Sequence, residues 1–339
     1  MITIHKFNEQ GELSPLPSDS IHDLHLNTEG NSGAGLIWID LEKSTIQEDE
    51  IVFKKVFPVH KLTLEDISYL RDVNKKPHLP KVEEYPTYLF VILNPLCDDF
   101  QHATKVLDLD HATTQLSVFI SPRFLITHHL SSLVGIREVM TYLERHALKP
   151  HHGSDFILHL IIDGIIDRYR PLLDSLEEHF NQLEEVVFVA PEKSKLQDLI
   201  GLKRVINVLR KTLVHEKEIL FRLGRGEFQV ISENRTIYYR DVYDHAARFI
   251  EAIENNRDMV SDLLQAHLSS SSNKLNEVMK VLTIISILIL PMTVISGIYG
   301  MNFEHQPEVH WQYGYPMALF LMFLTSFGSY RFFKFIKWI

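Results

Sequence analysis

The chain has 339 residues, long enough for two or more domains, with 44 acidic and 34 basic side chains and a formal net charge of −10. This acidic balance argues against a nucleic-acid-binding protein, which needs a basic face to displace counterions from phosphates. The one cysteine, Cys97, excludes an internal disulfide framework and fits a reducing, cytosolic setting. The first residues contain no apolar segment of signal-peptide length, so we expect that this end is not secreted.

Residues 1–150 are expected to form a cytoplasmic α/β domain. Segments that are apolar and rich in β-branched or aromatic side chains predict strands at Leu36–Asp40, Thr87–Asn94 and Leu116–His129. The segment Leu62–Leu70 predicts a short helix, and the break at Lys149–Ser154 ends the domain.

Residues 151–280 predict a cytoplasmic helical stalk that continues into the membrane. Apolar side chains recur at alternating steps of three and four, as in a coiled-coil seam, at Leu199, Leu202, Ile206, Leu209 and Leu213. Gly224 and Gly226 interrupt this pattern, and a helical pattern resumes near Tyr238. Because no proline follows before Pro291, one helix can run from the stalk into the apolar region.

Two runs without charged residues, 281–299 and 314–330, predict two transmembrane helices. At 1.5 Å per residue the first run spans about 28 Å, close to the thickness of the hydrocarbon core. Interfacial aromatic residues flank the second run, namely Trp311, Tyr313, Tyr315, Tyr330 and Trp338. A pair of buried core helices is the alternative interpretation of the same two runs.

The flanking charges predict the orientation of this hairpin. Lys274 and Lys280 precede the first run and the tail 331–339 is basic, whereas the loop 300–313 contains no Lys or Arg. The positive-inside rule then places both termini in the cytoplasm and the loop outside. We expect a multi-pass protein of the cell's inner (plasma) membrane.

Small or polar side chains recur along the first predicted transmembrane helix. Steps of three and four give a stripe at Asn276, Met279, Thr283, Ser286, Leu290, Thr293 and Gly297. Such a stripe fits either close packing between helices or the lining of a water-filled path.

If the stripe lines a pore, the pore needs several copies of the chain, because two helices cannot enclose a path. No carboxylate lies within either run to replace the water around a dehydrated cation. An ion that keeps its water shell, such as Mg²⁺, fits amide, hydroxyl and carbonyl oxygens better. Pro291 is expected to kink the helix or free a carbonyl group.

The segment Tyr299–Phe303, YGMNF, follows the first run and resembles the motif of the CorA family of magnesium transport proteins. Similar segments extend over most of the chain and are weakest before residue 30. They comprise Glu304, Pro307, Glu308, Gly314–Pro316, the basic tail, Leu64–Ile67, Arg240–His245 and Ser272–Ile285.

The resemblance implies an α+β membrane protein with an N-terminal α/β cytoplasmic domain, a long helical stalk and two C-terminal transmembrane helices. It implies a homopentameric ion channel, not an enzyme, for Mg²⁺ influx down the electrochemical gradient, with Co²⁺ and Ni²⁺ as further ions. Its partners would be divalent metal ions, membrane lipid and further copies of the chain, without nucleic acid. The Gly300 carbonyl, Met301 and Asn302 would form the outer selectivity ring, and Glu304 and Glu308 would attract cations to its mouth.

On the family pattern the pore is lined by Asn276, Met279, Leu282, Ser286, Leu290 and Thr293. This set agrees with the stripe except that the spacing selects Thr283 where the family pattern selects Leu282. Met279, Leu282 and Leu290 would make a hydrophobic constriction that closes by dewetting. This chain has Leu290 at a position where close relatives commonly have methionine.

The resemblance also implies that Mg²⁺ is a regulatory ligand, which closes the channel when the internal concentration is high. The candidate regulatory residues are Glu65, Asp66, Asp163 and Asp241. Asp163 and Asp241 are equally compatible with ordinary charges on a helix surface. Gln265 stands where a relative carries an acidic residue, which puts one intersubunit metal site in doubt.

Two other functions fit part of the pattern. His305 and His310 in the loop favour a softer ion, so a transporter of Zn²⁺ or another divalent ion is an alternative. A membrane receptor without ion flux explains the hairpin but not the stripe. The glycines of Gly30–Gly35 lack the lysine of a phosphate-binding loop, and the pairs His128–His129 and His151–His152 lack zinc-site spacing.

Overall fold

The computed structural model describes residues 1–8, 10–23, 35–69, 71–72, 75–97, 112–148, 152–189, 193–301, 307 and 311–338. The chain forms two compact units, Met1–Leu263 and Leu264–Ile339. The first unit contains a β-sheet and the helices that pack on it. Helix α7 (Thr236–Tyr299) continues from the first unit into the second, which also contains α9 (Gly314–Phe335).

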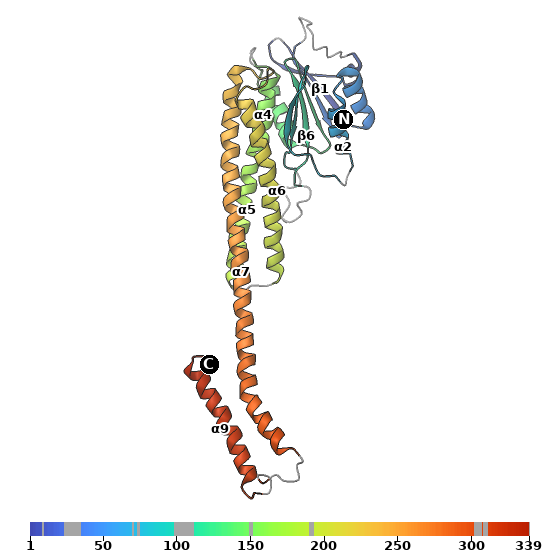
Figure 1. The fold of residues 1–339 in the computed structure, drawn as a ribbon. Helices are drawn as coiled ribbons and strands as arrows, with labels where there is room; N and C mark the ends of the chain where they lie inside the picture. The colour runs from blue at the N-terminus through green and yellow to red at the C-terminus, as the bar shows by residue number, and fades with distance from the viewer. Residues whose placement is uncertain are drawn as a thin grey trace. The chain divides into compact units, whose positions relative to one another are not determined.

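A seven-stranded sheet with the order β2-β1-β3-β7-β6-β5-β4 forms the centre of the first unit (Figure 1). Strands β3 and β7 pair in parallel, and the other neighbours pair in antiparallel fashion. The strands are β1 (Ile2–Phe7), β2 (Leu13–Leu16), β3 (Ile37–Glu42), β4 (Lys81–Glu84), β5 (Leu89–Leu93), β6 (Leu116–Ser121) and β7 (Phe124–His129).

The predicted strands at Leu36–Asp40 and Thr87–Asn94 are confirmed as β3 and β5. The segment Leu116–His129 forms two strands rather than one, because the chain turns back at residues 122 and 123. Pro122 has no N–H to donate to a sheet ladder, so a turn is the natural place for it. Two adjacent strands, β6 and β7, result from one apolar segment.

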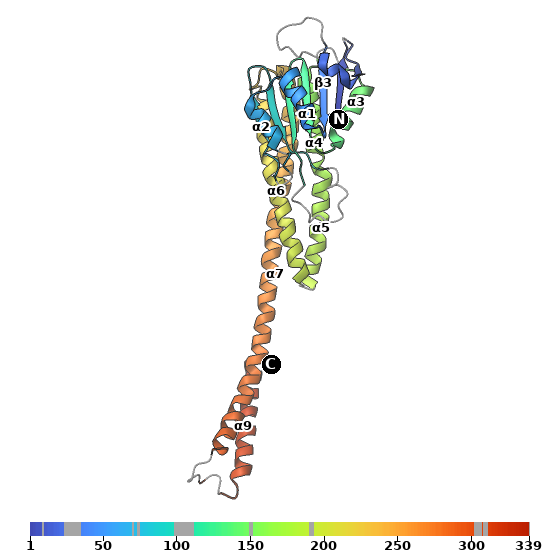
Figure 2. The ribbon, with the colours of Figure 1, turned by 90° about the vertical axis from the view of Figure 1, so that its right-hand side faces the viewer.

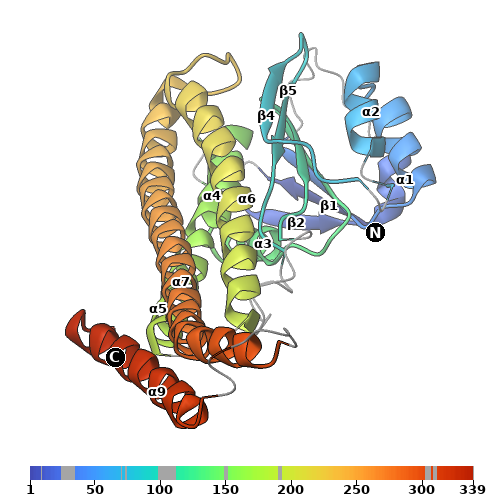
Figure 3. The ribbon, with the colours of Figure 1, turned by 60° about the horizontal axis from the view of Figure 1, so that its bottom comes forward.

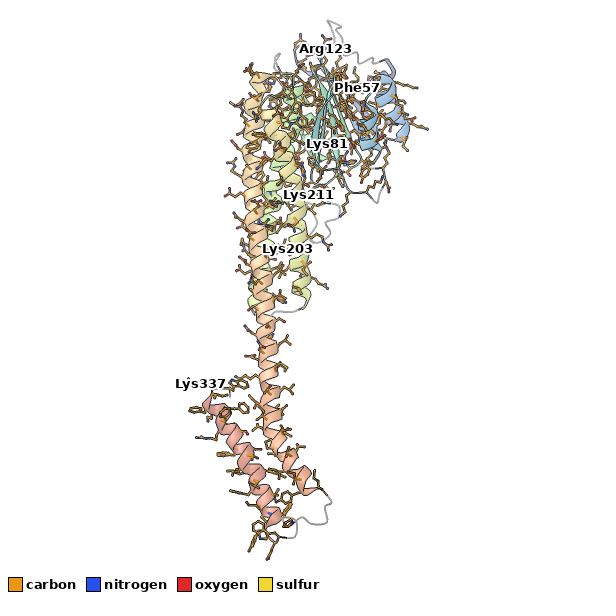
Figure 4. All side chains as sticks on the ribbon, in the orientation of Figure 1. Phe57, Lys81, Arg123, Lys203, Lys211 and Lys337 are labelled. Atoms are coloured by element: carbon orange, nitrogen blue, oxygen red, sulfur yellow. The ribbon has the colours of Figure 1, made fainter. Side chains whose placement is uncertain are left out.

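One face of the sheet is covered by α1 (Ile46–Glu50), its π-helical continuation η2 (Ile51–Val56) and α2 (Lys61–Tyr69), with η1 (Ser18–Asp23) beside them. Figure 2 shows α1 and α2 in front of the strands. A capping box starts α1, since the Thr45 hydroxyl accepts from the Glu48 N–H and the Glu48 carboxylate accepts from the Thr45 N–H. The rings of Phe53 and Phe57 pack on Phe119 of the sheet, with centroid distances of 5.0 and 6.3 Å. Phe57 is labelled in Figure 4.

Longer helices cover the opposite face, so that the sheet lies between two helical layers (Figure 3). The Leu199–Leu213 seam is confirmed, because its five side chains are 0–1 % exposed. The helices are α3 (Val134–Arg145), α4 (Ser154–Asp167), α5 (Tyr169–Val189), α6 (Lys193–Gly224) and, after η4 (Glu233–Arg235), the first part of α7. An ion pair joins α6 to α7, with 2.8 Å between the Arg210 guanidinium and a carboxylate oxygen of Glu254.

A buried polar tie joins the sheet to these helices. The Asn94 N–H, just after β5, donates to Glu216 Oε1 of α6 at 3.1 Å. The Tyr169 hydroxyl of α5 donates to the Asn94 carbonyl at 3.4 Å. Both backbone groups of Asn94 are therefore satisfied by side chains from helices, as buried backbone polar groups require.

In the second unit, α7 continues through Ser269–Ser272 and Pro291 to Tyr299, as the sequence predicted. Its ribbon bends in the orange-red final part of the helix (Figure 1). Pro291 lies inside the helix. The Ser326 hydroxyl of α9 donates to the Leu288 carbonyl at 3.0 Å and joins the two helices. Helix α9 continues to Phe335, so the first residues of the predicted basic tail are helical.

Candidate functional site

The stripe along α7 is exposed in the protomer. Asn276, Ser286 and Thr293 are exposed, as are Met279, Leu282 and Leu290 at 54–63 %, while Thr283 is half-buried. Exposed apolar side chains on this scale indicate a surface that faces lipid or other protein. The structure thus places all seven predicted pore-lining residues on one helix and leaves six of them exposed.

Helix α9 packs on the opposite side of α7. Ile284 is buried and Leu288, Pro291 and Ile295 are half-buried, at steps of four, three and four. With about 100° per residue, Leu288 lies roughly half a turn from Met279. Because α9 occupies that side, the stripe is left for contact with other copies of the chain or with water.

The two threonine hydroxyls of the stripe donate hydrogen bonds within the helix. The Thr283 hydroxyl donates to the Met279 carbonyl at 2.7 Å, and the Thr293 hydroxyl donates to the Ile289 carbonyl at 3.2 Å. Their oxygens therefore remain as acceptors. Acceptor oxygens suit contact with the water molecules that surround a hydrated cation.

The end of α7 leads into the predicted selectivity ring. The Gly300 N–H donates to the Ser296 carbonyl at 2.9 Å, and the Met301 N–H donates to the Ile298 carbonyl at 3.2 Å. Both Gly300 and Met301 are exposed. The predicted residues Asn302, Glu304 and Glu308, and the histidines His305 and His310, lie outside the described residues.

A second constellation occurs in the first unit, where α4 and α7 run side by side. Asp163, Asp167 and His245 each offer one ligand atom, and these three atoms lie within 4.8 Å of one another. Such a set could hold a divalent cation. Burial raises the pKa of Asp163, the nearby Asp167 and Asp241 raise it further, and His245 lowers it.

The structure brings Asp163 and Asp241 together but not the other two predicted regulatory residues. Asp66 of α2 forms an ion pair with Lys81 at 2.7 Å, and Glu65 lines a separate cavity between α1 and α2. Asp167 and His245 escaped the sequence analysis. Helical spacing could have indicated them, because Asp167 lies one turn after Asp163 and His245 lies one turn after Asp241.

The paired histidines form no zinc site with each other. His128 lies 3.4 Å from Asp49 and His129 lies 3.1 Å from Asp40, on opposite faces of β7. Neighbouring residues of a strand point to opposite faces, which separates these two side chains. The raised pKa of His129 follows from its hydrogen bond to Asp40 and nearby negative charges, which outweigh the effect of burial.

One helix within the described residues, Glu233–Tyr299, contains a segment long and apolar enough to cross a membrane. The family model described as "CorA-like Mg2+ transporter protein" matches residues 33–334. The chain belongs to the CorA family. The resemblance found in the sequence is thereby confirmed, as are the N-terminal α/β domain and the long helix of the predicted fold class. The second transmembrane helix of that prediction, 314–330, stays a prediction.

Individual CorA relatives support the assignment. The cobalt/magnesium transport protein CorA of Thermotoga maritima is 35 % identical over 305 residues, covering 89 % of this chain and 83 % of that protein. The complete structure of the CorA magnesium transporter from Methanocaldococcus jannaschii superposes with a TM-score of 0.78 at 21 % identity, covering 100 % of this chain and 99 % of that one. CorA is a family of transport proteins, not of enzymes.

The cytoplasmic domain of ZntB from Vibrio parahaemolyticus also shares the fold. Its TM-score is 0.59 at 14 % identity, covering 80 % of this chain and 99 % of that one. An identity this low shows a common fold alone. The fold of the cytoplasmic domain therefore does not distinguish a magnesium transporter from a zinc transporter.

Proposed function

We propose that the chain is one subunit of a homopentameric channel that carries Mg²⁺, with Co²⁺ and Ni²⁺ as further ions, into the cytoplasm. The observation that carries the proposal is the exposed stripe of α7, which leads to Gly300 while α9 packs on the other side. One chain cannot enclose a path, so the stripes of several copies must meet to do so. Both termini would lie in the cytoplasm, with 281–299 and 314–330 crossing the inner (plasma) membrane.

The membrane potential supplies the driving force for influx. An inside-negative potential contributes about 2.3 kcal/mol per charge for each 100 mV, or roughly 4.6 kcal/mol for a divalent ion. An oxygen-lined path without carboxylates lets Mg²⁺ keep its water molecules, which it releases reluctantly. Transport down the gradient then needs no other energy source.

The decisive experiment is ion flux into liposomes that contain the purified full-length protein and a Mg²⁺-sensitive dye. An imposed inside-negative potential is expected to drive Mg²⁺ influx, with Zn²⁺ and Co²⁺ measured in parallel. Zn²⁺ flux without Mg²⁺ flux would support the zinc transporter. No flux of any divalent ion, from folded oligomeric protein, would support the receptor instead.

The hydrophobic constriction gives a direct prediction at Leu290. We expect Leu290→Ser to raise Mg²⁺ influx severalfold at high internal Mg²⁺, because a hydroxyl favours water in a pore that otherwise closes by dewetting. Leu290→Met, similar in volume and apolarity, should still close. Equal closing in the Ser and Met variants would show that Leu290 does not form the gate.

We further propose that Asp163, Asp167, Asp241 and His245 form the regulatory cation site. The proposal is supported by the mutual distances of Asp163, Asp167 and His245, and by the raised pKa of Asp163, to which burial, Asp167 and Asp241 contribute. A divalent cation would relieve the repulsion among these carboxylates. Glu65 and Asp66 of a neighbouring copy remain candidates for completing the site.

Removing two of these charges should weaken the response to internal Mg²⁺. In a variant with Asp163→Asn and Asp167→Asn, we expect the ratio of influx at low and high internal Mg²⁺ to fall toward one. The same flux assay with preloaded internal Mg²⁺ measures this ratio. Glu178→Gln removes an exposed charge from α5 and should leave it unchanged. A normal ratio in the double variant would place sensing elsewhere.

A further inference from the structure

A groove of about 570 Å³ lies in the second unit, between α7 and the C-terminal Trp338. Its apolar wall on α7 consists of Val278, Val281, Leu282, Ile284 and Ile285. Lys280 and Glu277 line it as well, at the end of the apolar run. Figures 1 and 2 both show the C-terminus next to α7 at this level.

The groove is centred on the side of α7 that faces away from the stripe, and Leu282 lies at its edge, about 60° from Met279 around the helix. At about 100° per residue, Val281 and Ile284 lie roughly 160° and 140° from Met279 around the helix. Ile284 also lies one turn before Leu288, which contacts α9. In a ring whose stripes face the pore, this groove would therefore face outward.

Trp338 is held at the groove by the end of α9. The Trp338 N–H donates to the Phe333 carbonyl at 2.9 Å, and the Lys337 N–H donates to the Lys334 carbonyl at 3.2 Å. Lys337 adopts the left-handed conformation, with φ of 58°, and completes a Schellman motif. Stacking of Trp338 on Phe333, at 5.7 Å and 16°, fixes the indole further.

This end of the second unit is strongly cationic. Lys337 lies at the end of α9 (Figure 4), and Glu277 is the one carboxylate that faces these cations among the described residues after residue 263. None of the cations forms an ion pair with another residue of the described ranges. The cations are Lys274, Lys280, Arg331, Lys334 and Lys337.

We propose that the groove binds an anionic glycerophospholipid. Its phosphate would interact with the Lys280 ammonium and the Trp338 indole N–H, and its acyl chains would pack against Val281, Ile284 and Ile285. A further copy of the chain is a poorer occupant, because each copy brings the same cations to this level. The proposal rests on the proposed function only in placing the second unit in a membrane.

Quenching of Trp338 fluorescence by brominated lipid tests the proposal. The full-length protein is reconstituted in phosphatidylcholine vesicles with a small fraction of brominated phosphatidylglycerol or of brominated phosphatidylcholine, with bromine near the headgroup. The chain has three tryptophans, so the Trp338 signal is the difference between the wild type and Trp338→Phe. We expect stronger quenching by the anionic lipid at equal mole fraction.

Lys280→Gln should lower the preference for anionic over zwitterionic lipid, measured by Trp338 quenching, about fivefold. This is the effect of one basic residue near an anionic surface. Lys274→Gln, which removes a charge outside the groove, should keep it. Equal quenching by both lipids overturns the proposal. So does the absence of quenching in protein that conducts Mg²⁺, which would mean that another copy fills the groove. A lipid preference without ion flux would contradict the proposed function but would support the lipid site.

Discussion

Replacing Asn302 by alanine is expected to reduce Mg²⁺ influx at least about tenfold while the protein still folds and assembles. Each copy would lose one side-chain amide that holds the water shell of the ion. A hydrogen bond contributes about 0.5–1.5 kcal/mol, and the loss repeats in every subunit of the ring. A change of about 1.4 kcal/mol already corresponds to a factor of ten in rate.

The described residues support this expectation up to Met301. Helix α7 ends at Tyr299, and the hydrogen bonds from Gly300 and Met301 hold the chain at the helix end. A Cβ added to Gly300 would lie 3.2 Å from the Ser296 carbonyl, so the backbone approaches closely there. Asn302 is the next residue in the sequence after Met301, the second residue beyond the end of α7.

The liposome flux assay measures the effect of Asn302→Ala, with oligomer size as a control for assembly. Glu308→Gln is the matched control in the same loop, because it removes a charge from the mouth rather than an amide from the ring. We expect that variant to need more external Mg²⁺ for half-maximal influx at an unchanged maximal rate. Influx at the wild-type level in Asn302→Ala would show that the ion does not contact this amide.

The long helices could be predicted because their signals are local. The apolar runs, the absence of proline before Pro291 and the Leu199–Leu213 seam each depend on neighbours a few residues apart. The stripe also follows from helical spacing alone. Helical spacing does not indicate which side of α7 packs against α9. That contact is tertiary, and it comes from the structure of the folded chain.

The sheet and the acidic cluster depend on residues far apart in sequence. Strand β3 pairs with β7 across more than 80 residues, and no local pattern predicts that neighbour. Likewise Asp167 meets His245 because α4 lies beside α7. The sequence selected Asp163 and Asp241 through family resemblance and missed the two residues that complete the cluster.

Glu216 shows a signal that was present but overlooked. The seam that ends at Leu213 continues with the same steps through Glu216, Leu220 and Leu223. A carboxyl group at a seam position must be buried, and Glu216 is 1 % exposed. Its Oε1 accepts from the Asn94 N–H, while its Oε2 has no partner among the described residues.

This burial raises the pKa of Glu216 from its ordinary value of 4.5 to about 8, although the hydrogen bond from Asn94 acts in the opposite direction. The folded state therefore holds a proton that the unfolded state releases at a lower pH. Between pH 4.5 and about 8 the folded state binds more protons, so the free energy of unfolding decreases as pH rises. At about 1.4 kcal/mol per pH unit, the total loss is on the order of 5 kcal/mol.

Glu216→Gln should abolish this loss, because the amide has no proton to release and its oxygen can still accept from Asn94. We expect the variant to match the wild type near pH 5 and to exceed it in stability increasingly up to pH 8. Thermal unfolding of the full-length protein in detergent, followed by the fluorescence of the buried Trp38, measures the difference at each pH.

Glu218→Gln is the control for Glu216→Gln, since Glu218 lies two residues away and is exposed. That variant should follow the wild-type pH profile throughout. A difference between Glu216→Gln and the wild type that stays constant from pH 5 to 9 would show that Glu216 does not titrate in the folded state. The expected result, a difference that grows with pH, would show that a buried proton helps to hold α6 against the sheet.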